Sequence, residues 1–291
     1  MVNVITPDAI EGLRQQLSSE AFLSFAASEC GLLPERIAQI VADYTAEVAM
    51  GARVLDGIPL AGRRILEVGA GLGLLSILLK RSGCAITALE PGANGFDANA
   101  KLGAAVLKWL HAEDLPVLGV EADQIDPALN GSFDVIFSIN VLEHIPDLSG
   151  AIAAMTKALA PGGVMVHLCP NYAIPYEPHF GLLLVPGAPR ATARLLPHLV
   201  GNAVWASLNF VTASQVRGFG RRSGLTTTFR KGMTYEAFMR LDQDDAFGAR
   251  HPGLVSRLHR AMKAMGVLRL LRHIPATWAT PMVFEYRRQD A

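Results

Sequence analysis

The sequence predicts an α/β fold, a doubly wound and mostly parallel seven-stranded sheet with helices on both faces. Three observations predict it. Short apolar runs that suit strands alternate with helical segments between residues 64 and 170. These runs are continuously apolar, as in strands that are buried on both faces. A cluster of glycines, at residues 69–73, directly follows the first run.

The elements can be placed by their hydrophobic periodicity and their bounding glycines and prolines. Helices are expected at 74–81, 95–111, 148–159 and 212–223, with a mostly helical stretch over 236–273. A turn at 161–163 is expected to separate a helix from the fifth strand. The expected strands are 64–68, 84–89, 119–121, 133–140, 164–169, 225–230 and 281–287.

The domain organisation follows from where this alternation starts and stops. Residues 1–60 are expected to form an N-terminal helical extension, and residues 61–291 the ligand-binding domain. Within that domain the proline-rich segment 170–211 interrupts the alternation, and we expect it to be an acceptor or lid insertion. A second, helical insertion is expected over 236–276.

The composition is that of a folded protein with a large core. The chain has 291 residues, of which 51% are hydrophobic and 18% charged, a balance that excludes disorder. Cys30, Cys84 and Cys169 lack a CxxC spacing, which argues against disulfides or a zinc site and fits a cytoplasmic location. An acidic N-terminus argues against a signal peptide, and polar residues within 195–211 argue against a transmembrane segment.

The glycine cluster belongs to the segment Glu-Val-Gly-Ala-Gly-Leu-Gly at 67–73. Glycine allows positive φ and removes the Cβ, so a ligand can approach the backbone closely. The spacing G-x-G-x-G differs from the dinucleotide fingerprint G-x-G-x-x-G, because Leu74 occupies the later position. Glu67 precedes the glycines, where its charge favours a cationic ligand and opposes a pyrophosphate.

This segment resembles the first motif, E/D-x-G-x-G-x-G, of class I S-adenosylmethionine (SAM)-dependent methyltransferases. Further segments are similar in order and spacing: Glu90 after the second strand, Asp123-Gln124 after the third, 133–145 with its Leu-Glu-His sequence, and the turn 159–163. The resemblance implies SAM as cofactor, with Glu90 on the ribose and Asp123 near the adenine. The implied cofactor-binding residues are Glu67, Gly69, Ala70, Gly71, Gly73, Glu90, Pro91, Ala122, Asp123, Gln124 and Asn140.

Glu143 and His144 follow the fourth strand, and we expect them to cap and anchor the next helix. The alternative is a metal site, because ubiquinone-biosynthesis O-methyltransferases are similar here and can place a metal near this stretch. An acid expected three residues before Glu143 is Asn140 in this chain. We therefore predict no metal. Asp134 is expected to have a structural role.

The segment Pro-Asn-Tyr-Ala-Ile-Pro-Tyr-Glu-Pro-His-Phe at 170–180 resembles one found in a subset of class I methyltransferases. It leaves the fifth strand at its carboxyl end, the edge at which open α/β sheets bind ligands. We predict that it forms the acceptor wall, with His179 as a base that takes the acceptor's proton. Tyr172, Tyr176 and Glu177 are predicted to position the reactants. The alternative is a rigid loop whose polar side chains satisfy one another.

Charge is distributed unevenly, with acids in excess up to residue 147 and basic residues in excess after it. A basic surface can attract an anionic small molecule, or a glycan- or lipid-linked acceptor; the alternative is a solvated basic face. Residues 255–272 form a basic amphipathic segment, which packs on its own domain or contacts a membrane surface peripherally. The apolar stretches 182–185 and 195–211 are expected to cover the acceptor or form a homodimer contact.

These patterns together predict a SAM-dependent methyltransferase that modifies an oxygen or nitrogen of a small-molecule, glycan- or lipid-linked acceptor. The alternatives are an NAD-dependent oxidoreductase or epimerase and a catalytically inactive SAM-binding scaffold protein. Nucleic acid is not expected as a partner, because the chain has no N/D-P-P-Y/F signature and no RNA-binding module. The sequence leaves the acceptor and its reacting atom open.

Overall fold

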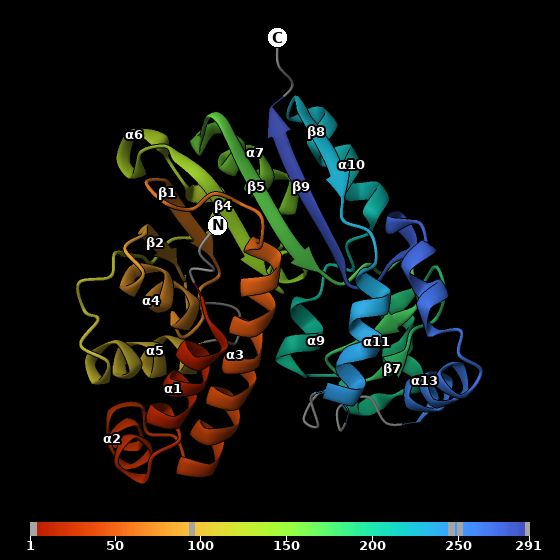
Figure 1. The fold of residues 1–291 in the computed structure, drawn as a ribbon, viewed down its shortest axis with the longest axis horizontal. Helices are drawn as coiled ribbons and strands as arrows, with labels where there is room; N and C mark the ends of the chain where they lie inside the picture. The colour runs from red at the N-terminus through yellow and green to blue at the C-terminus, as the bar shows by residue number, and fades with distance from the viewer. Residues whose placement is uncertain (1–4, 93–96, 244–247, 249–252, 289–291) are drawn as a thin grey trace. The chain divides into compact units, whose positions relative to one another are not determined.

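The computed structural model describes residues 5–92, 97–243, 248 and 253–288. The chain, drawn as a ribbon in Figure 1, divides by its internal contacts into two compact units. Unit 1 comprises residues 1–141 and 147–167, and unit 2 comprises residues 142–146 and 168–289.

The strands form a seven-stranded sheet in the order β3-β2-β1-β4-β5-β9-β8. β1 runs parallel to both β2 and β4, and β2 parallel to β3, whereas β8 and β9 are antiparallel. The predicted mostly parallel α/β sheet is therefore confirmed. The strands are β1 (Arg64–Val68), β2 (Ala85–Leu89), β3 (Val117–Leu118), β4 (Phe133–Ile139), β5 (Leu159–Cys169), β8 (Leu225–Phe229) and β9 (Met282–Arg288).

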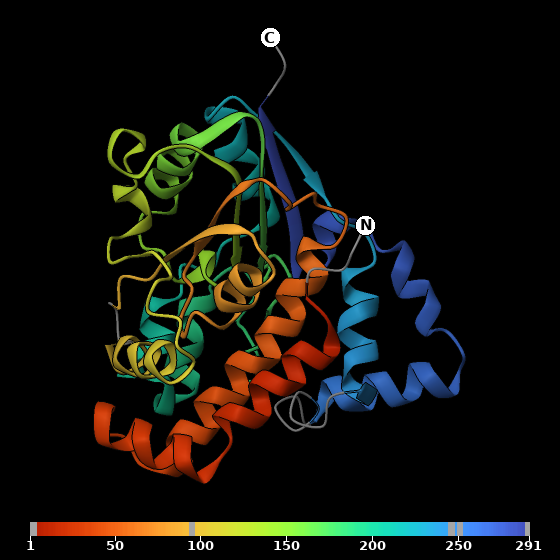
Figure 2. The same ribbon diagram turned by 60° about the vertical axis from the view of Figure 1, so that its left-hand side comes forward.

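The N-terminal helices belong to unit 1, the same unit as the glycine turn. They are α1 (Pro7–Leu17), α2 (Glu20–Cys30) and α3 (Pro34–Leu55). Thr6 and Ser19 cap α1 and α2 by accepting backbone N–H groups. Phe22 and Phe25 pack against Trp109 at the end of α5. α3 runs beside α1 in both ribbon views (Figures 1 and 2) and contacts α4, the helix after the glycine turn.

The remaining unit 1 helices connect the strands. Asp147 caps α7 by accepting the N–H of Gly150. Asp134 accepts the N–H of Arg64 at 2.8 Å, which links β4 to β1. The helices are α4 (Leu74–Arg81), α5 (Asp97–Trp109), α6 (Pro127–Asn130) and α7 (Leu148–Ala158), with a single 3₁₀ turn η1 (Ala122–Gln124).

Unit 2 builds a small core of its own. Tyr172, Trp205 and Phe210 stack edge to face, Tyr172 against Phe210 and Trp205 against Phe210. Leu199 and Leu208 are fully buried beside them. The elements before the last two strands are η2 (Leu142–His144), β6 (Tyr176–Glu177), β7 (Leu182–Leu183), η3 (Pro189–Ala191), α8 (Thr192–Leu195), η4 (Pro197–Leu199), α9 (Ala203–Ser207) and α10 (Ala213–Arg222). The last helical elements are α11 (Met233–Gln243), α13 (Leu254–Ala264), η5 (Leu268–His273) and η6 (Ala276–Trp278).

Several predicted bounds were wrong. The third strand is Val117–Leu118, where the backbone pairs with Ala88 and Leu89, and the predicted 119–121 strand is a bend leading into η1. β5 begins at Leu159, so the turn expected at 161–163 lies inside the strand. The segment 170–211 contains short helices and an antiparallel pair, β6 with β7, because its apolar side chains form a core. Residues 95 and 96 of the helix expected at 95–111, and residues 244–247 and 249–252 of the helical stretch expected over 236–273, lie outside the described residues.

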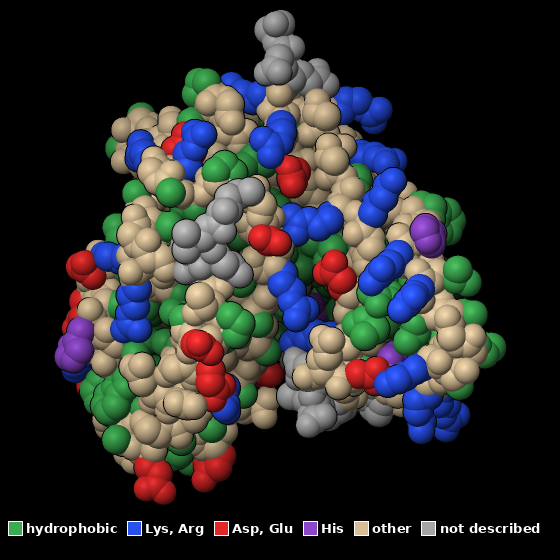
Figure 3. All heavy atoms as spheres, in the orientation of Figure 1, with side chains coloured by type: hydrophobic (Ala, Val, Ile, Leu, Met, Phe, Trp, Pro, Cys, Tyr) green, Lys and Arg blue, Asp and Glu red, His purple; other side chains and the backbone are tan. Residues whose placement is uncertain are grey.

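The two units differ in surface charge. Acidic side chains gather over the red and orange N-terminal helices, and Lys and Arg side chains gather over the cyan to blue elements of unit 2 (Figure 3). Among the described residues, no helix has the length and hydrophobicity required to span a bilayer.

Candidate active site

The turn after β1 favours glycine at every second residue from 69 to 73. Gly69, Gly71 and Gly73 have φ values of 72°, 57° and 72°, which favour glycine. A Cβ on Gly71 would lie 2.1 Å from Cε1 of Tyr44, and one on Gly69 would lie 2.4 Å from Cγ2 of Val141. Both side chains therefore pack directly on the turn, and larger residues there would displace them.

Glu90, directly after β2, holds the turn from the other side. Its Oε2 accepts the N–H of Gly71 at 2.7 Å, and its Oε1 accepts the N–H of Gly92 at 3.1 Å. Burial raises the pKa of Glu90, and these two hydrogen bonds oppose the shift. The carboxylate is thus fixed at the end of β2, the position predicted for a ribose partner.

Glu67, near the end of β1, lines a pocket beside the glycine turn. It is 6% exposed. Its Oε2 accepts the hydroxyl of Ser76 at 2.5 Å. Burial raises its pKa to about 8, with the nearby Glu47 and Glu90 adding to the shift and Ser76 opposing it. A carboxyl group in this state becomes ionised readily when a cation enters.

Three residues of α3 complete the pocket. Tyr44, Glu47 and Val48 line it together with Glu67, Gly69 and Ala70. The hydroxyl of Tyr44 accepts the side-chain N–H of Asn99 at 2.8 Å. Neither Tyr44 nor Glu47 was predicted as a site residue, because nothing in the local sequence links this helix to the glycine turn.

The other predicted cofactor residues lie elsewhere in unit 1. Asn140 has a φ of 54° and donates its side-chain N–H to Oε1 of Glu47 at 2.9 Å. Gln124 is used within η1, where its side chain accepts the N–H of Glu121. Of the predicted cofactor residues, only Glu67, Gly69 and Ala70 line the pocket, and Asp123 is exposed. Their roles in cofactor binding stay predictions.

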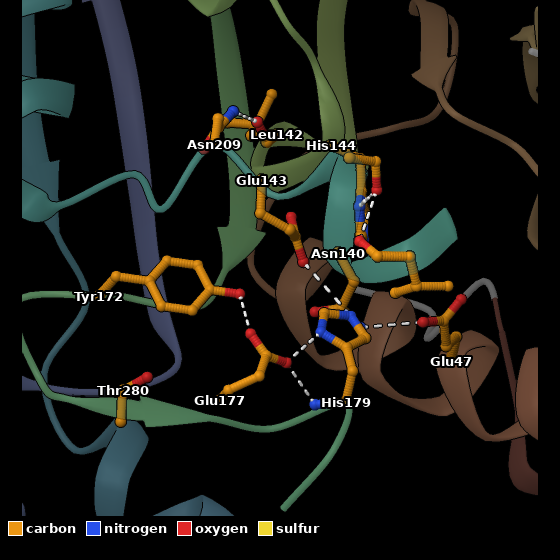
Figure 4. A network of polar contacts seen from close by, with 12 residues as sticks. Glu47, Asn140, Leu142, Glu143, His144, Tyr172, Glu177, His179, Asn209 and Thr280 are labelled. Carbon is orange, nitrogen blue, oxygen red and sulfur yellow. Dashed lines mark hydrogen bonds and ion pairs between the residues drawn. The ribbon is translucent and has the colours of Figure 1, made fainter. Parts of the chain in front are cut away.

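A second polar cluster lies in unit 2 and contains three of the predicted acceptor-side residues (Figure 4). The hydroxyl of Tyr172 donates to Glu177 Oε2 at 2.5 Å. Glu177 Oε1 accepts the backbone N–H of His179 at 2.6 Å and contacts its ring Nδ1 at the same distance. Glu177 is fully buried and its backbone lies in β6. The sequence therefore named a set of residues that the fold does bring together.

Tyr176, the fourth predicted residue, lies next to Glu177 in β6. Burial and the charge of Glu177 raise its pKa to about 12. Its hydroxyl is therefore protonated at neutral pH. Its backbone pairs with Leu183.

Glu143 and His144 join this cluster from the turn η2. Glu143 is fully buried, and its Oε1 lies 3.9 Å from Nε2 of His179. The His144 ring packs edge-on against that of His179, and its Nδ1 contacts Ser207 Oγ at 2.7 Å. Burial, with a further contribution from His179, lowers the pKa of His144 to about 3. The prediction that Glu143 and His144 cap the next helix was wrong, because Asp147 caps it.

Asn209 fixes the turn that carries these two residues. Its side-chain N–H groups donate to the carbonyls of Leu142 at 2.7 Å and Ile145 at 2.9 Å. Glu143, His144 and His179 place potential ligand atoms within 4.8 Å of one another. These are the residues that would hold a metal ion in unit 2 if one bound.

The sequence matches a family model described as "Methyltransferase domain" over residues 35–228, two thirds of the chain. The chain belongs to this methyltransferase family. The methyltransferase is 35% identical over 226 residues to an uncharacterised protein of Mycobacterium tuberculosis, covering 74% of this chain and 75% of that one. It is 41% identical over 115 residues to a ubiquinone biosynthesis O-methyltransferase of Paramagnetospirillum magneticum, covering 37% of this chain and 41% of the relative.

Among solved structures, the methyltransferase is similar to phosphoethanolamine N-methyltransferase 2 of Haemonchus contortus in complex with SAM. The TM-score is 0.47 at 17% identity, over 84% of this chain and 52% of that structure, so this chain spans about half of it. The methyltransferase is a SAM-dependent enzyme. The alternative of an NAD-dependent oxidoreductase was therefore wrong.

Proposed function

We propose that this enzyme transfers the methyl group of SAM to an oxygen or nitrogen of a small-molecule acceptor, with His179 as the general base. The observation that carries the proposal is the histidine held by a buried carboxylate. Glu177 accepts from Nδ1 of His179, which leaves Nε2 as the basic nitrogen. Tyr172 fixes the second oxygen of the same carboxylate, so the orientation of the imidazole is set by two linked contacts.

This arrangement suits an acceptor that loses a proton. SAM supplies a methyl carbon bound to a positively charged sulfur; the carbon–sulfur bond breaks as the acceptor's bond to carbon forms. The acceptor's proton then passes to Nε2 of His179. The imidazolium that results lies between two fully buried carboxylates, Glu177 and Glu143. Buried opposite charges stabilise that cation more strongly than water-exposed ones do.

An anionic acceptor fits the charge of unit 2. Arg190 lies over the ring of Phe210, at 5.5 Å from its centroid, and donates to the carbonyl of Leu208. Phe210 in turn packs against Tyr172, so a fixed guanidinium lies one aromatic ring away from the hydrogen-bonded residues. Phosphate or carboxylate groups on the acceptor are natural partners for this arginine.

The proposal is tested by His179→Gln, with His198→Gln as the control. His198 is an exposed histidine of the same segment. Release of S-adenosylhomocysteine is measured with a panel of hydroxyl and amine compounds, each in a neutral and a phosphorylated form. We expect His179→Gln to lower kcat by about 10²- to 10⁴-fold while the affinity for SAM and the activity of His198→Gln stay unchanged. Full activity of His179→Gln would show that His179 is not the base.

A further inference from the structure

The N-terminal helix α3 supplies an acidic side chain to the pocket beside the glycine turn. Glu47 lines this pocket opposite the end of β1, where Glu67, Gly69 and Ala70 lie. Among the described residues that line it, none is a lysine, arginine or histidine. The pocket therefore offers two carboxyl groups, Glu47 and Glu67, and no basic side chain to a ligand.

The backbone of the turn offers no free N–H donors to an anion at Gly69 and Ala70. The N–H groups of Gly69 and Ala70 both donate to the carbonyl of Leu89, at 2.8 and 3.0 Å. They are therefore engaged in holding the turn to β2. A carboxylate or phosphate at this end would meet the charge of Glu47 without these two donors, which costs free energy.

We infer that Glu47 is a cofactor-binding residue and that it binds the α-ammonium group of the methionine part of SAM. Of the two cationic centres of SAM, only the ammonium carries N–H donors that can hydrogen-bond to a carboxylate. The sulfonium offers charge alone. Glu90 is fixed at the end of β2 by Gly71 and Gly92, the position of a ribose partner, which leaves the Glu47 end for the amino-acid part.

Glu47 is held in place before any ligand arrives. Asn140, directly after β4, donates to its Oε1 at 2.9 Å, and Asn140 itself has a left-handed φ of 54° (Figure 4). One turn earlier in α3, Tyr44 packs on Gly71 and is held by Asn99. Groups fixed in this way lose little conformational entropy when the ligand binds.

The test is isothermal titration of Glu47→Gln with three ligands, SAM, S-adenosylhomocysteine and 5′-methylthioadenosine. The first two carry the ammonium; the third lacks the whole amino-acid part. Because the variant loses a charge-assisted hydrogen bond, we expect it to bind SAM and S-adenosylhomocysteine about 10- to 100-fold more weakly. Its affinity for 5′-methylthioadenosine should match the wild type. These titrations need no acceptor, so their outcome is independent of the role proposed for His179.

The matched control is Glu35→Gln, which removes the same charge from an exposed position in the first turn of the same helix. It should bind all three ligands as the wild type does. Unchanged affinity of Glu47→Gln for SAM would overturn the inference. If Glu47→Gln bound only SAM more weakly, Glu47 would interact with the sulfonium, and the inference would also be overturned. Equal weakening for all three ligands would show that Glu47 only supports the fold, and circular dichroism would reveal a misfolded variant.

Discussion

Replacing Glu67 by glutamine should remove a pH dependence from the stability of the protein. Burial raises the pKa of this carboxyl from its ordinary value of 4.5 to about 8. At neutral pH it is therefore protonated in the folded protein and ionised in the unfolded chain. The folded state then binds the extra proton, so the free energy of unfolding falls as the pH rises from about 4.5 to about 8.

The size of this effect follows from the difference between the two pKa values. A difference of about 3.5, at about 1.4 kcal/mol for each pKa unit, gives about 5 kcal/mol over the whole window. Between pH 5 and pH 7 the same relation gives about 2–3 kcal/mol. Glutamine keeps an oxygen that can accept the hydroxyl of Ser76 but has no charge to bury. The variant should therefore gain stability relative to wild type by about 2–3 kcal/mol between pH 5 and pH 7.

Urea unfolding followed by circular dichroism at pH 5, 6, 7 and 8 measures this difference. Glu35→Gln again serves as the control, because that carboxyl is exposed and its removal should not alter the pH dependence. If the unfolding free energies of Glu67→Gln and wild type run parallel from pH 5 to pH 8, Glu67 is not protonated in the folded protein, and the reasoning is refuted.

Two further predictions concern the glycine turn and the cluster of unit 2. Gly57 has a φ of 81° and open space where a Cβ would lie, so Gly57→Ala should lower the free energy of unfolding by about 1–2 kcal/mol. Gly71→Ala should lower it by about 1–3 kcal/mol more, because its Cβ meets Tyr44. Equal losses for the two variants in thermal unfolding would contradict this. Dialysis against EDTA should leave methyl transfer unchanged. Inactivation reversed by Mg²⁺ or Zn²⁺ would instead make Nε2 of His179 a metal ligand.

Features set by neighbouring residues were predictable from the sequence. The alternation of strands and helices, and the positive φ values at Gly69, Gly71 and Gly73, follow from local composition. Asp134 proved structural as expected, because it accepts the N–H of Arg64. The third strand was misplaced because its two residues, Val117 and Leu118, form a strand only through pairing with β2, and no periodic pattern extends over so short a run.

Features set by distant residues were missed. Tyr44 and Glu47 reach the glycine turn because α3 packs beside α4, a contact that periodicity cannot reveal. His179, Glu177 and Tyr172 were found because they lie within one short segment. Their companion Glu143 was assigned to helix capping, since its approach to His179 depends on how Asn209 fixes the turn η2.

The most direct test of the account is a calorimetric titration of the purified protein with SAM and with NAD. An acidic pocket behind a glycine turn should bind SAM and leave NAD unbound, and Glu90→Ala should weaken SAM binding strongly because Glu90 holds the turn at Gly71. Binding of NAD in place of SAM, or unchanged SAM affinity in Glu90→Ala, would contradict the cofactor site proposed at the glycine turn.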